Sequence, residues 1–220
     1  MITSLPMYWR DETADLWQQF WRQVQAQTDL PDLTPPDKLP PNWVDHWLDP
    51  NLTLSMTCSL PFRTSLRDKV TYVGTLSFGL PGKPGYYYSC QISSLNDTGQ
   101  RRLAINGADS QSGWAVATFD ALPYSQIIET GSHAASLTAV ASGQADLAFI
   151  DVVTWRLLER YDPLAAQVRV LERSVATPGL PLITAKGNDP SGLQGAIHAA
   201  CESFATNDPM AKRGPLYLSS

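Results

Sequence analysis

The chain has 220 residues, of which 43% are hydrophobic, and its seven tryptophans supply ample bulk for a folded core. The net charge of −5 argues against a nucleic-acid partner, because proteins that bind nucleic acids usually present a basic face. No run of the sequence approaches the roughly 20 apolar residues of a membrane-spanning helix, so we expect no membrane span.

The first part of the chain predicts short strands separated by a helix and a proline-rich stretch. The helix has Leu16, Phe20 and Val24 on one face, a spacing typical of an amphipathic helix. The expected elements are a strand over residues 2–7, a helix over 11–27, a loop or short helical turn over 30–50, and strands over 52–56 and 70–76.

The rest of the chain alternates strands with helices, which predicts mostly parallel α/β sheets. Strands are expected over residues 86–92, 103–105, 126–129, 147–150, 168–172 and 182–184, with helices over 113–122, 133–142, 152–161 and 191–204. Chain crossings near residues 80–85 and 172–178 predict two lobes: residues 1–85 with 172–220, which hold both termini, and residues 86–171. A ligand should bind in a central cleft, at the carboxyl ends of the strands.

Two hydroxyl-rich helix starts are the most informative motifs of the sequence. Ser110-Gln111-Ser112-Gly113-Trp114 follows the strand over 103–105, and Gly131-Ser132-His133 follows the strand over 126–129. The N-terminus of a helix offers unpaired N–H groups and a partial positive charge, so it binds anions without a lysine. The two motifs therefore predict a pocket for a small oxyanion, and Asp151 places a carboxylate near its rim.

Each of these side chains also has a structural interpretation. Ser110, Ser112 and Ser132 are either helix N-caps or hydrogen-bond donors to the anion, and Asp151 is either the N-cap of the next helix or a ligand contact. Gly113 would let the backbone approach the ligand, so that the amides of Gly113 and Trp114 face the anion, and the Trp114 side chain is either core or pocket wall. The helix dipole disfavours a protonated His133, but a neutral ring can still donate one hydrogen bond to an oxyanion.

These stretches resemble the phosphate, phosphite and phosphonate substrate-binding proteins of ABC transporters. The resemblance runs from about Val70 to Thr184 and is carried in order by Tyr86-Tyr87-Tyr88-Ser89, the Ser110–Gly113 turn, residues 130–137 and 139–148, Asp151, and residues 178–182. It implies an α/β, two-lobed type 2 periplasmic-binding-protein fold with a central cleft, and ABC permease components as partners. It also implies a ligand contact from Tyr87. Acidic residues of that family hold the amine of aminophosphonates; Asp151 alone is evident here, which argues against such a ligand.

No catalytic motif, metal-ligand spacing or phosphate-binding loop occurs in the sequence, so we expect no catalytic residue, metal or cofactor. The predicted function is binding of a small oxyanion of the phosphate, phosphite or phosphonate class in an interlobe cleft. The alternatives are an enzyme of small-molecule or cofactor biosynthesis on the same fold and a cytoplasmic ligand sensor. Tyr8, which follows the first strand, and the loop Thr57-Cys58-Ser59 are the candidate contacts from the first lobe. The predicted ligand-binding residues are Tyr8, Tyr87, Ser110, Gln111, Ser112, Gly113, Trp114, Ser132, His133 and Asp151.

The start of the chain has neither the basic region nor the long apolar run of a secretory signal. Its three cysteines, Cys58, Cys90 and Cys201, are an odd number, which indicates reduced thiols rather than a disulfide framework. We therefore predict a cytoplasmic protein, or a periplasmic one if the chain is a processed form.

Overall fold

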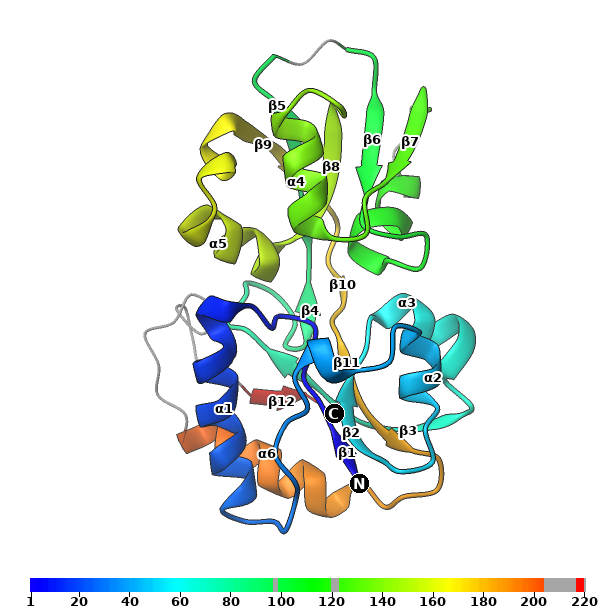
Figure 1. Cartoon of the computed structure of the whole chain (residues 1–220), viewed down its shortest axis with the longest axis vertical. Helices are drawn as coiled ribbons and strands as arrows, with labels where there is room; N and C mark the ends of the chain where they lie inside the picture. The colour runs from blue at the N-terminus through cyan, green and yellow to red at the C-terminus, as the bar shows by residue number, and fades with distance from the viewer. Residues whose placement is uncertain (97–98, 120–122, 204–216, 220) are drawn as a thin grey trace. The chain divides into compact units, whose positions relative to one another are not determined.

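A computed structural model describes residues 1–96, 99–119, 123–203 and 217–219 (Figure 1). The chain divides into two units, Met1–Tyr86 with Pro178–Ser220, and Tyr87–Thr177. The two segments that join them pair as a two-stranded sheet of β4 (Tyr86–Tyr87) and β10 (Thr177–Pro178). Glycine is needed beside this pair, because a Cβ on Gly179 would lie 2.8 Å from the carbonyl oxygen of Gly85.

The first unit is built on a five-stranded sheet in the order β1-β2-β11-β3-β12. Among the described strands of this unit, β1 and β2 alone pair in parallel, because β11 is antiparallel to both β2 and β3, and β12 is also antiparallel to β3. The expectation of mostly parallel sheets is therefore wrong for this unit. The strands are β1 (Ile2–Thr3), β2 (Leu52–Met56), β3 (Val70–Ser77), β11 (Pro181–Ala185) and β12 (Tyr217–Ser219).

Helices of the first unit pack on this sheet and on one another. Helices α1 and α6 are in contact, and α6 also packs against β3. The helical elements are α1 (Asp11–Gln25), η1 (Pro36–Lys38), α2 (Trp43–Trp47), α3 (Ser59–Pro61), the π-helical turn η2 (Phe62–Leu66) and α6 (Ser191–Ser203). No pattern in the sequence predicted the helical stretch over residues 59–66, and the expected strand over 2–7 ends at Thr3.

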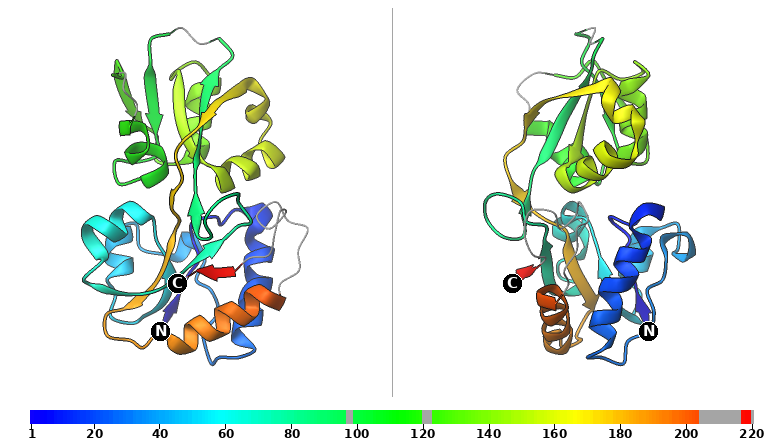
Figure 2. Two further views of the ribbon diagram at one scale, coloured as in Figure 1. Left: turned by 180° about the vertical axis from the view of Figure 1, so that it is seen from behind. Right: turned by 90° about the vertical axis from the view of Figure 1, so that its left-hand side faces the viewer.

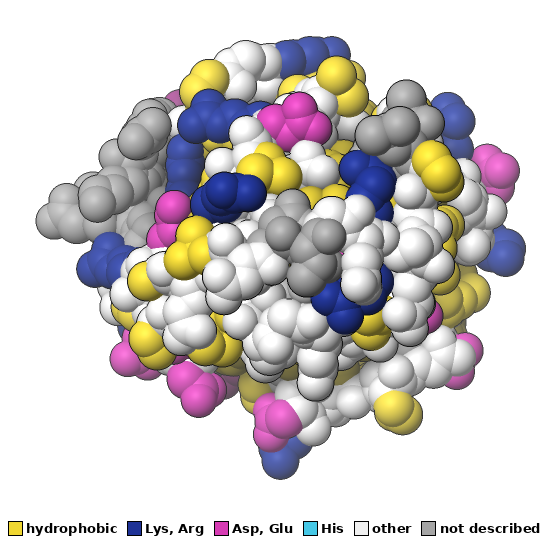
Figure 3. Space-filling model, turned by 90° about the horizontal axis from the view of Figure 1, so that it is seen from above, with side chains coloured by type: hydrophobic (Ala, Val, Ile, Leu, Met, Phe, Trp, Pro, Cys, Tyr) yellow, Lys and Arg dark blue, Asp and Glu magenta, His cyan; other side chains and the backbone are white. Residues whose placement is uncertain are grey.

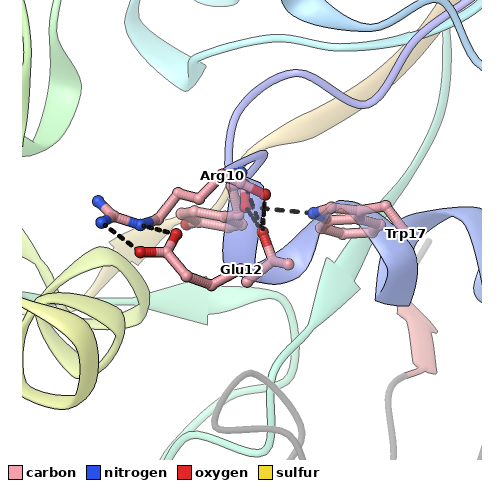
Figure 4. Close-up of polar contacts among 5 residues, drawn as sticks. Arg10, Glu12 and Trp17 are labelled. Atoms are coloured by element: carbon pink, nitrogen blue, oxygen red, sulfur yellow. Dashed lines mark hydrogen bonds and ion pairs between the residues drawn. The ribbon is translucent and has the colours of Figure 1, made fainter.

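The start of α1 is fixed by a small polar network (Figure 4). The carbonyl oxygen of Tyr8 accepts hydrogen bonds from the Thr13 hydroxyl, at 2.8 Å, and from the indole N–H of Trp17, at 3.2 Å. Arg10 donates to Glu12 across the first turn. The helix then buries Trp17, with Phe20, Trp21 and Val24 of the same face.

A second polar network lies in the interior of the first unit. The Nε2 atom of His46 is 2.9 Å from the hydroxyl of Ser4 and 3.3 Å from that of Ser55, and the two hydroxyls are 2.8 Å apart. His46 is only 2% exposed. Burial therefore lowers the pKa of its imidazole, and the Asp49 carboxylate raises it by less.

The second unit is built on a five-stranded sheet in the order β7-β6-β8-β5-β9. Strands β7, β6 and β8 are parallel, and β5 is antiparallel to both β8 and β9. The strands are β5 (Ser89–Ser94), β6 (Arg102–Ile105), β7 (Gln126–Glu129), β8 (Leu147–Asp151) and β9 (Val168–Arg173).

Two α-helices of the second unit, α4 (His133–Ala141) and α5 (Val152–Tyr161), lie on the same side of its sheet in the right-hand view of Figure 2. Three short turns complete the unit: η3 (Gln111–Ala115), η4 (Ala117–Phe119) and η5 (Pro163–Gln167). The helix expected over residues 113–122 is instead the π-helical turn η3 followed by the 3-10 turn η4, and its last residues lie outside the described part of the chain.

On the face drawn in Figure 3, the described residues form no large basic patch. Lys and Arg side chains lie there in separate small groups among uncharged side chains. This distribution agrees with the acidic balance of the sequence. None of the helices in the described ranges is long and apolar enough to cross a membrane.

Candidate anion-binding site

The predicted site residues of the second unit gather at one edge of its sheet. Parallel strands end on the same side, so the segments after β6, β7 and β8 all leave the sheet at this edge. Strand β5 runs the other way and starts there, with Ser89 directly opposite Asp151. We call this the anion edge, and define it by Ser89, Ser110, Ser112, His133 and Asp151.

Ser110 caps the turn that follows β6. Its hydroxyl accepts a hydrogen bond from the N–H of Gly113 at 2.9 Å. Its carbonyl oxygen accepts from the N–H groups of Trp114 and Ala115, at 3.2 and 2.9 Å. The amides of Gly113 and Trp114, which we expected to face the anion, are therefore occupied inside the turn.

The structure explains why position 113 is a glycine. A Cβ atom at this position would lie 2.0 Å from Oδ1 of Asn106, the residue that follows β6. The close approach that glycine permits here is to the Asn106 side chain. Oδ1 of Asn106 is buried and has no hydrogen-bond partner among the described residues.

Ser112 links the turn after β6 to the helix after β7. Its hydroxyl lies 2.9 Å from Nε2 of His133. Its carbonyl oxygen accepts a hydrogen bond from the hydroxyl of Ser89 at 2.9 Å, which fixes the turn against β5. Among the described contacts, the side chain of Ser112 thus reaches the side chain of another predicted site residue, whereas that of Ser110 bonds to the backbone.

Ser132 is the N-cap of α4. Its hydroxyl accepts from the N–H of Ala135 at 3.1 Å, and its carbonyl oxygen accepts from the N–H of Ser136. The helix-start N–H groups of His133 and Ala134 precede these bonds, so helix geometry gives them no intrahelical acceptor. They are the amide donors that α4 can offer an anion.

Asp151 closes β8 and caps α5. Its Oδ1 atom accepts from the N–H groups of Val153 and Thr154, at 3.0 and 2.9 Å. Its other oxygen, Oδ2, lies 3.5 Å from Nε2 of His133, and the side chain is only 6% exposed. The capping interpretation of Asp151 is therefore confirmed, and a single oxygen is left to face the site.

His133 lies at the centre of these contacts. Its side chain is 12% exposed. Burial lowers the pKa of the imidazole below its ordinary value, and the nearby Asp151 carboxylate raises it by less. Nε2 faces Ser112 and Asp151, whereas Nδ1 is buried and has no hydrogen-bond partner in the described part of the chain.

The approach of a serine, a histidine and an aspartate does not make a catalytic triad here. In a triad, the carboxylate holds one ring nitrogen and the serine hydroxyl contacts the other. Asp151 and Ser112 instead both face Nε2 of His133. The residues described also contain no group of three or more His, Cys, Asp or Glu side chains that could hold a metal ion.

The other predicted ligand residues have different surroundings. Tyr8 belongs to the first unit, where its buried ring packs edge-on against Phe78 with 5.1 Å between ring centroids. Tyr87 is a buried residue at the start of the second unit, and Gln111 is buried in η3. Trp114 is partly buried and packs against the core cluster of Leu103, Ile105, Val116, Ala117, Leu147 and Phe149.

Sequence reasoning missed Ser89, Asn106 and Thr130 at this edge. Ser89 comes to the site through antiparallel pairing with β8, which no local motif signals. Thr130 supports the start of α4 through a hydroxyl contact to Ser136 at 2.8 Å and a hydrogen bond to the carbonyl oxygen of Ile105 at 2.9 Å. A polar residue directly after a strand was the available signal for Asn106 and Thr130.

Comparison with known families now adds to this geometry. Residues 89–212, more than half of the chain, match the family of ABC transporter, phosphonate, periplasmic substrate-binding proteins. The chain belongs to this family. The prediction made from the sequence motifs is thereby confirmed. A comparison with curated proteins gave no match.

Solved structures show the same fold at low sequence identity. A binding protein of an ABC phosphonate transporter from Pseudomonas aeruginosa is 15% identical, with a TM-score of 0.72 over the whole of this chain and 81% of the other. A methylphosphonate complex from Prochlorococcus marinus is 12% identical, with a TM-score of 0.65 over 97% and 87% of the two chains. A malate-bound protein from Rhodopseudomonas palustris is also 12% identical, with a TM-score of 0.66 over 98% and 89%. The fold is therefore the two-lobed α/β fold of type 2 periplasmic binding proteins, as predicted.

Proposed function

We propose that the chain is a solute-binding protein that takes a small tetrahedral oxyanion of the phosphate, phosphite or phosphonate class at its anion edge. The observation that carries this proposal is that Ser112 and Asp151, which come from two other strand ends, both lie within 3.5 Å of Nε2 of His133. Family membership and the methylphosphonate bound to a structural neighbour support the same ligand class.

The donors in this proposal differ from those expected at first. The Ser112 hydroxyl, the His133 ring and the helix-start N–H groups of His133 and Ala134 replace the occupied amides of Gly113 and Trp114. Ser110 and Ser132 act on the anion indirectly, by shaping the two helix starts. Ligand contacts from Tyr8, Tyr87, Gln111 and Trp114 stay predictions.

Neutral donors suit an anion in this position. A hydrogen bond to a charged group contributes about 1.5–3 kcal/mol, so three or four of them can hold an oxyanion without a lysine or arginine. The single oxygen of Asp151 that faces the site is already close to His133, which leaves little capacity for the amine of an aminophosphonate. We therefore favour inorganic oxyanions and simple alkylphosphonates.

Calorimetry tests this ligand class. Phosphate, phosphite, methylphosphonate, sulfate and malate are titrated into the folded protein. We expect binding of at least one phosphorus oxyanion and a ten- to hundredfold weaker affinity in Ser112→Ala, at about 1.4 kcal/mol per decade. Ser142→Ala is the matched control, because Ser142 lies at the opposite end of α4 and its hydroxyl bonds only to the carbonyl of Ala139.

Two outcomes would contradict the proposal. If malate binds and none of the phosphorus oxyanions does, the site is specific for carboxylates instead. Unchanged affinity in Ser112→Ala for a confirmed phosphorus oxyanion would show that the two helix starts are structural caps. A biosynthetic gene cluster around the coding gene, in place of permease and ATPase genes, would instead favour an enzyme, and the sensor alternative would show as binding without transport.

A cytoplasmic location is the second part of the proposal. None of the three cysteines forms a disulfide, which suits a reducing compartment. The family is described as periplasmic, which supports the alternative of a processed form. Fractionation of cells that express the native gene tests the two: export with a longer precursor would overturn a cytoplasmic location.

A further inference from the structure

We propose that His133 takes up a proton when the oxyanion binds, so that anion binding at this edge is proton-coupled. The inference rests on the proposed function, because it concerns the same site. It is carried by the placement of the two ring nitrogens of His133. Nε2 lies 2.9 Å from the Ser112 hydroxyl and 3.5 Å from a carboxylate oxygen of Asp151, and Nδ1 is buried with no partner among the described residues.

A neutral His133 ring has a single N–H, which is fewer than the two acceptors beside it in the complex. A neutral imidazole carries a single N–H, and the second nitrogen can only accept. The Asp151 carboxylate beside Nε2 is an acceptor, and a deprotonated oxyanion is an acceptor too. An imidazole between two acceptors can donate to only one of them. The imidazolium carries an N–H on each nitrogen and a positive charge that both acceptors stabilise, so the arrival of the anion favours the protonated ring.

The charges around the ring support a neutral form before binding. Helix α4 carries no charged residue, and neither do η3, η5 and β5, which lie near it. On β6, Arg102 is paired with Asp146 at the far end of the strand, and β5 adds only Cys90, whose buried thiol has a pKa of about 12. Asp151 is thus the charged group that faces His133 in the described structure, and burial outweighs it.

The bound anion adds a second negative charge next to the ring. An opposite charge within about 4–6 Å favours the charged form of a titratable group. The pKa of His133 should therefore be higher in the complex than in the free protein. Affinity is then greatest at low pH and declines as the pH rises through the pKa of the bound form, by up to about tenfold per pH unit.

Calorimetry in several buffers measures how many protons the protein takes up when the anion binds. Methylphosphonate is titrated near neutral pH into wild type and His133→Gln, in buffers with different ionisation enthalpies. The ligand's own proton exchange is common to both proteins and cancels in the difference. We expect wild type to take up to about one proton more per bound anion than His133→Gln, which keeps a hydrogen-bonding side chain but does not titrate.

His198→Gln is the matched control. His198 lies on α6 of the first unit, is 56% exposed and pairs with Glu202, so its replacement should leave the proton count at the wild-type value. Equal proton uptake in wild type and His133→Gln, with binding intact in both, would overturn the inference and leave the proposed function standing. Absence of binding by phosphate, phosphite and methylphosphonate to wild type would overturn the proposed function, and the inference with it.

A second readout does not depend on affinity. The ring protons of His133, assigned by their loss in His133→Gln, are followed by NMR during a pH titration with and without saturating methylphosphonate. We expect the midpoint for His133 to lie below the ordinary histidine pKa of about 6.5 in the free protein and to rise in the complex. A midpoint that stays in place or falls would contradict proton uptake by this residue.

Discussion

Asn106 and Gly113 share one small space at the anion edge, where the carboxamide oxygen of Asn106 lies 2.0 Å from the position that a Cβ on Gly113 would take. The first residue follows β6, and the second lies in the turn capped by Ser110. Their fit holds that turn against the strand end, so the position of Ser112 depends on a residue without a side chain.

Gly113→Ala should destabilise the second unit by about 1–3 kcal/mol, because the added methyl group meets the Asn106 side chain. Denaturant unfolding measures the change. Gly195→Ala is the matched control: it lies in α6 with no atom within 4 Å of the added Cβ, and should stabilise by about 0.5–1 kcal/mol. Adding Asn106→Ala should restore part of the loss in Gly113→Ala; strictly additive effects would show that the two residues do not compete for space.

Trp17→Phe should destabilise the first unit by about 1–3 kcal/mol. The change removes the indole N–H that donates to the Tyr8 carbonyl and leaves space in a core where Trp17 is 1% exposed. Trp43→Phe, at a position that is 36% exposed, should change stability by less than about 1 kcal/mol. Thermal unfolding compares the two variants, and a similar loss in both would argue against a special role for the Tyr8 network.

The stability of the ligand-free protein should fall as the pH is lowered below about 6.5, the ordinary pKa of histidine. Burial lowers the pKa of His46 in the folded state, so the unfolded chain binds more protons between that lowered value and about 6.5. Above this range the contribution is fully present. His133 acts in the same direction.

Urea unfolding at several pH values measures this slope. His46→Gln should reduce the proton uptake on unfolding by up to about one proton. If His46→Gln fails to fold, the wild-type protein still tests the prediction. A free energy of unfolding that does not change between pH 5 and 6.5 would contradict the neutral state of the two buried histidines.

Cys58 should react with thiol reagents before Cys90 and Cys201. Burial raises the pKa of each of the latter two thiols to about 12, so only about one in ten thousand is a thiolate at pH 8. Cys58 is partly exposed at the start of α3. Mass spectrometry of the native protein after brief alkylation should find the label on Cys58; equal labelling of all three cysteines in native conditions would contradict the burial of the other two.

The strands and long helices of the fold were predictable where a local pattern determines them. The strand over 52–56 and the helix over 152–161 have the bounds that the sequence indicated, because apolar runs and caps mark their ends. The mixed sheets were not predictable from such patterns. The direction of β11 and β5 depends on pairing between residues far apart in the chain, such as Ile183 with Tyr72.

The sequence predicted which strand ends carry the site residues, but it predicted less well which atoms those residues contact. The sequence marked Ser112, His133 and Asp151 as site residues, and the structure brings them together. It also marked the amides of Gly113 and Trp114, which Ser110 occupies. Which donor a capping serine takes is decided by the shape of a turn, and the π-helical form of η3 had no signal in the residue pattern.

Hydrogen bonds between Ser89 and Ser174 join the two places where the chain enters and leaves the second unit. The N–H of Ser89 donates to the hydroxyl of Ser174, and the N–H of Ser174 donates to the carbonyl of Ser89, both at 2.9 Å. A unit whose ends adjoin can be set into a loop of another domain without forcing that loop apart. Residues 87–177 therefore have the geometry of a cassette, one that evolution or an engineer could exchange as a block for another anion-binding insert.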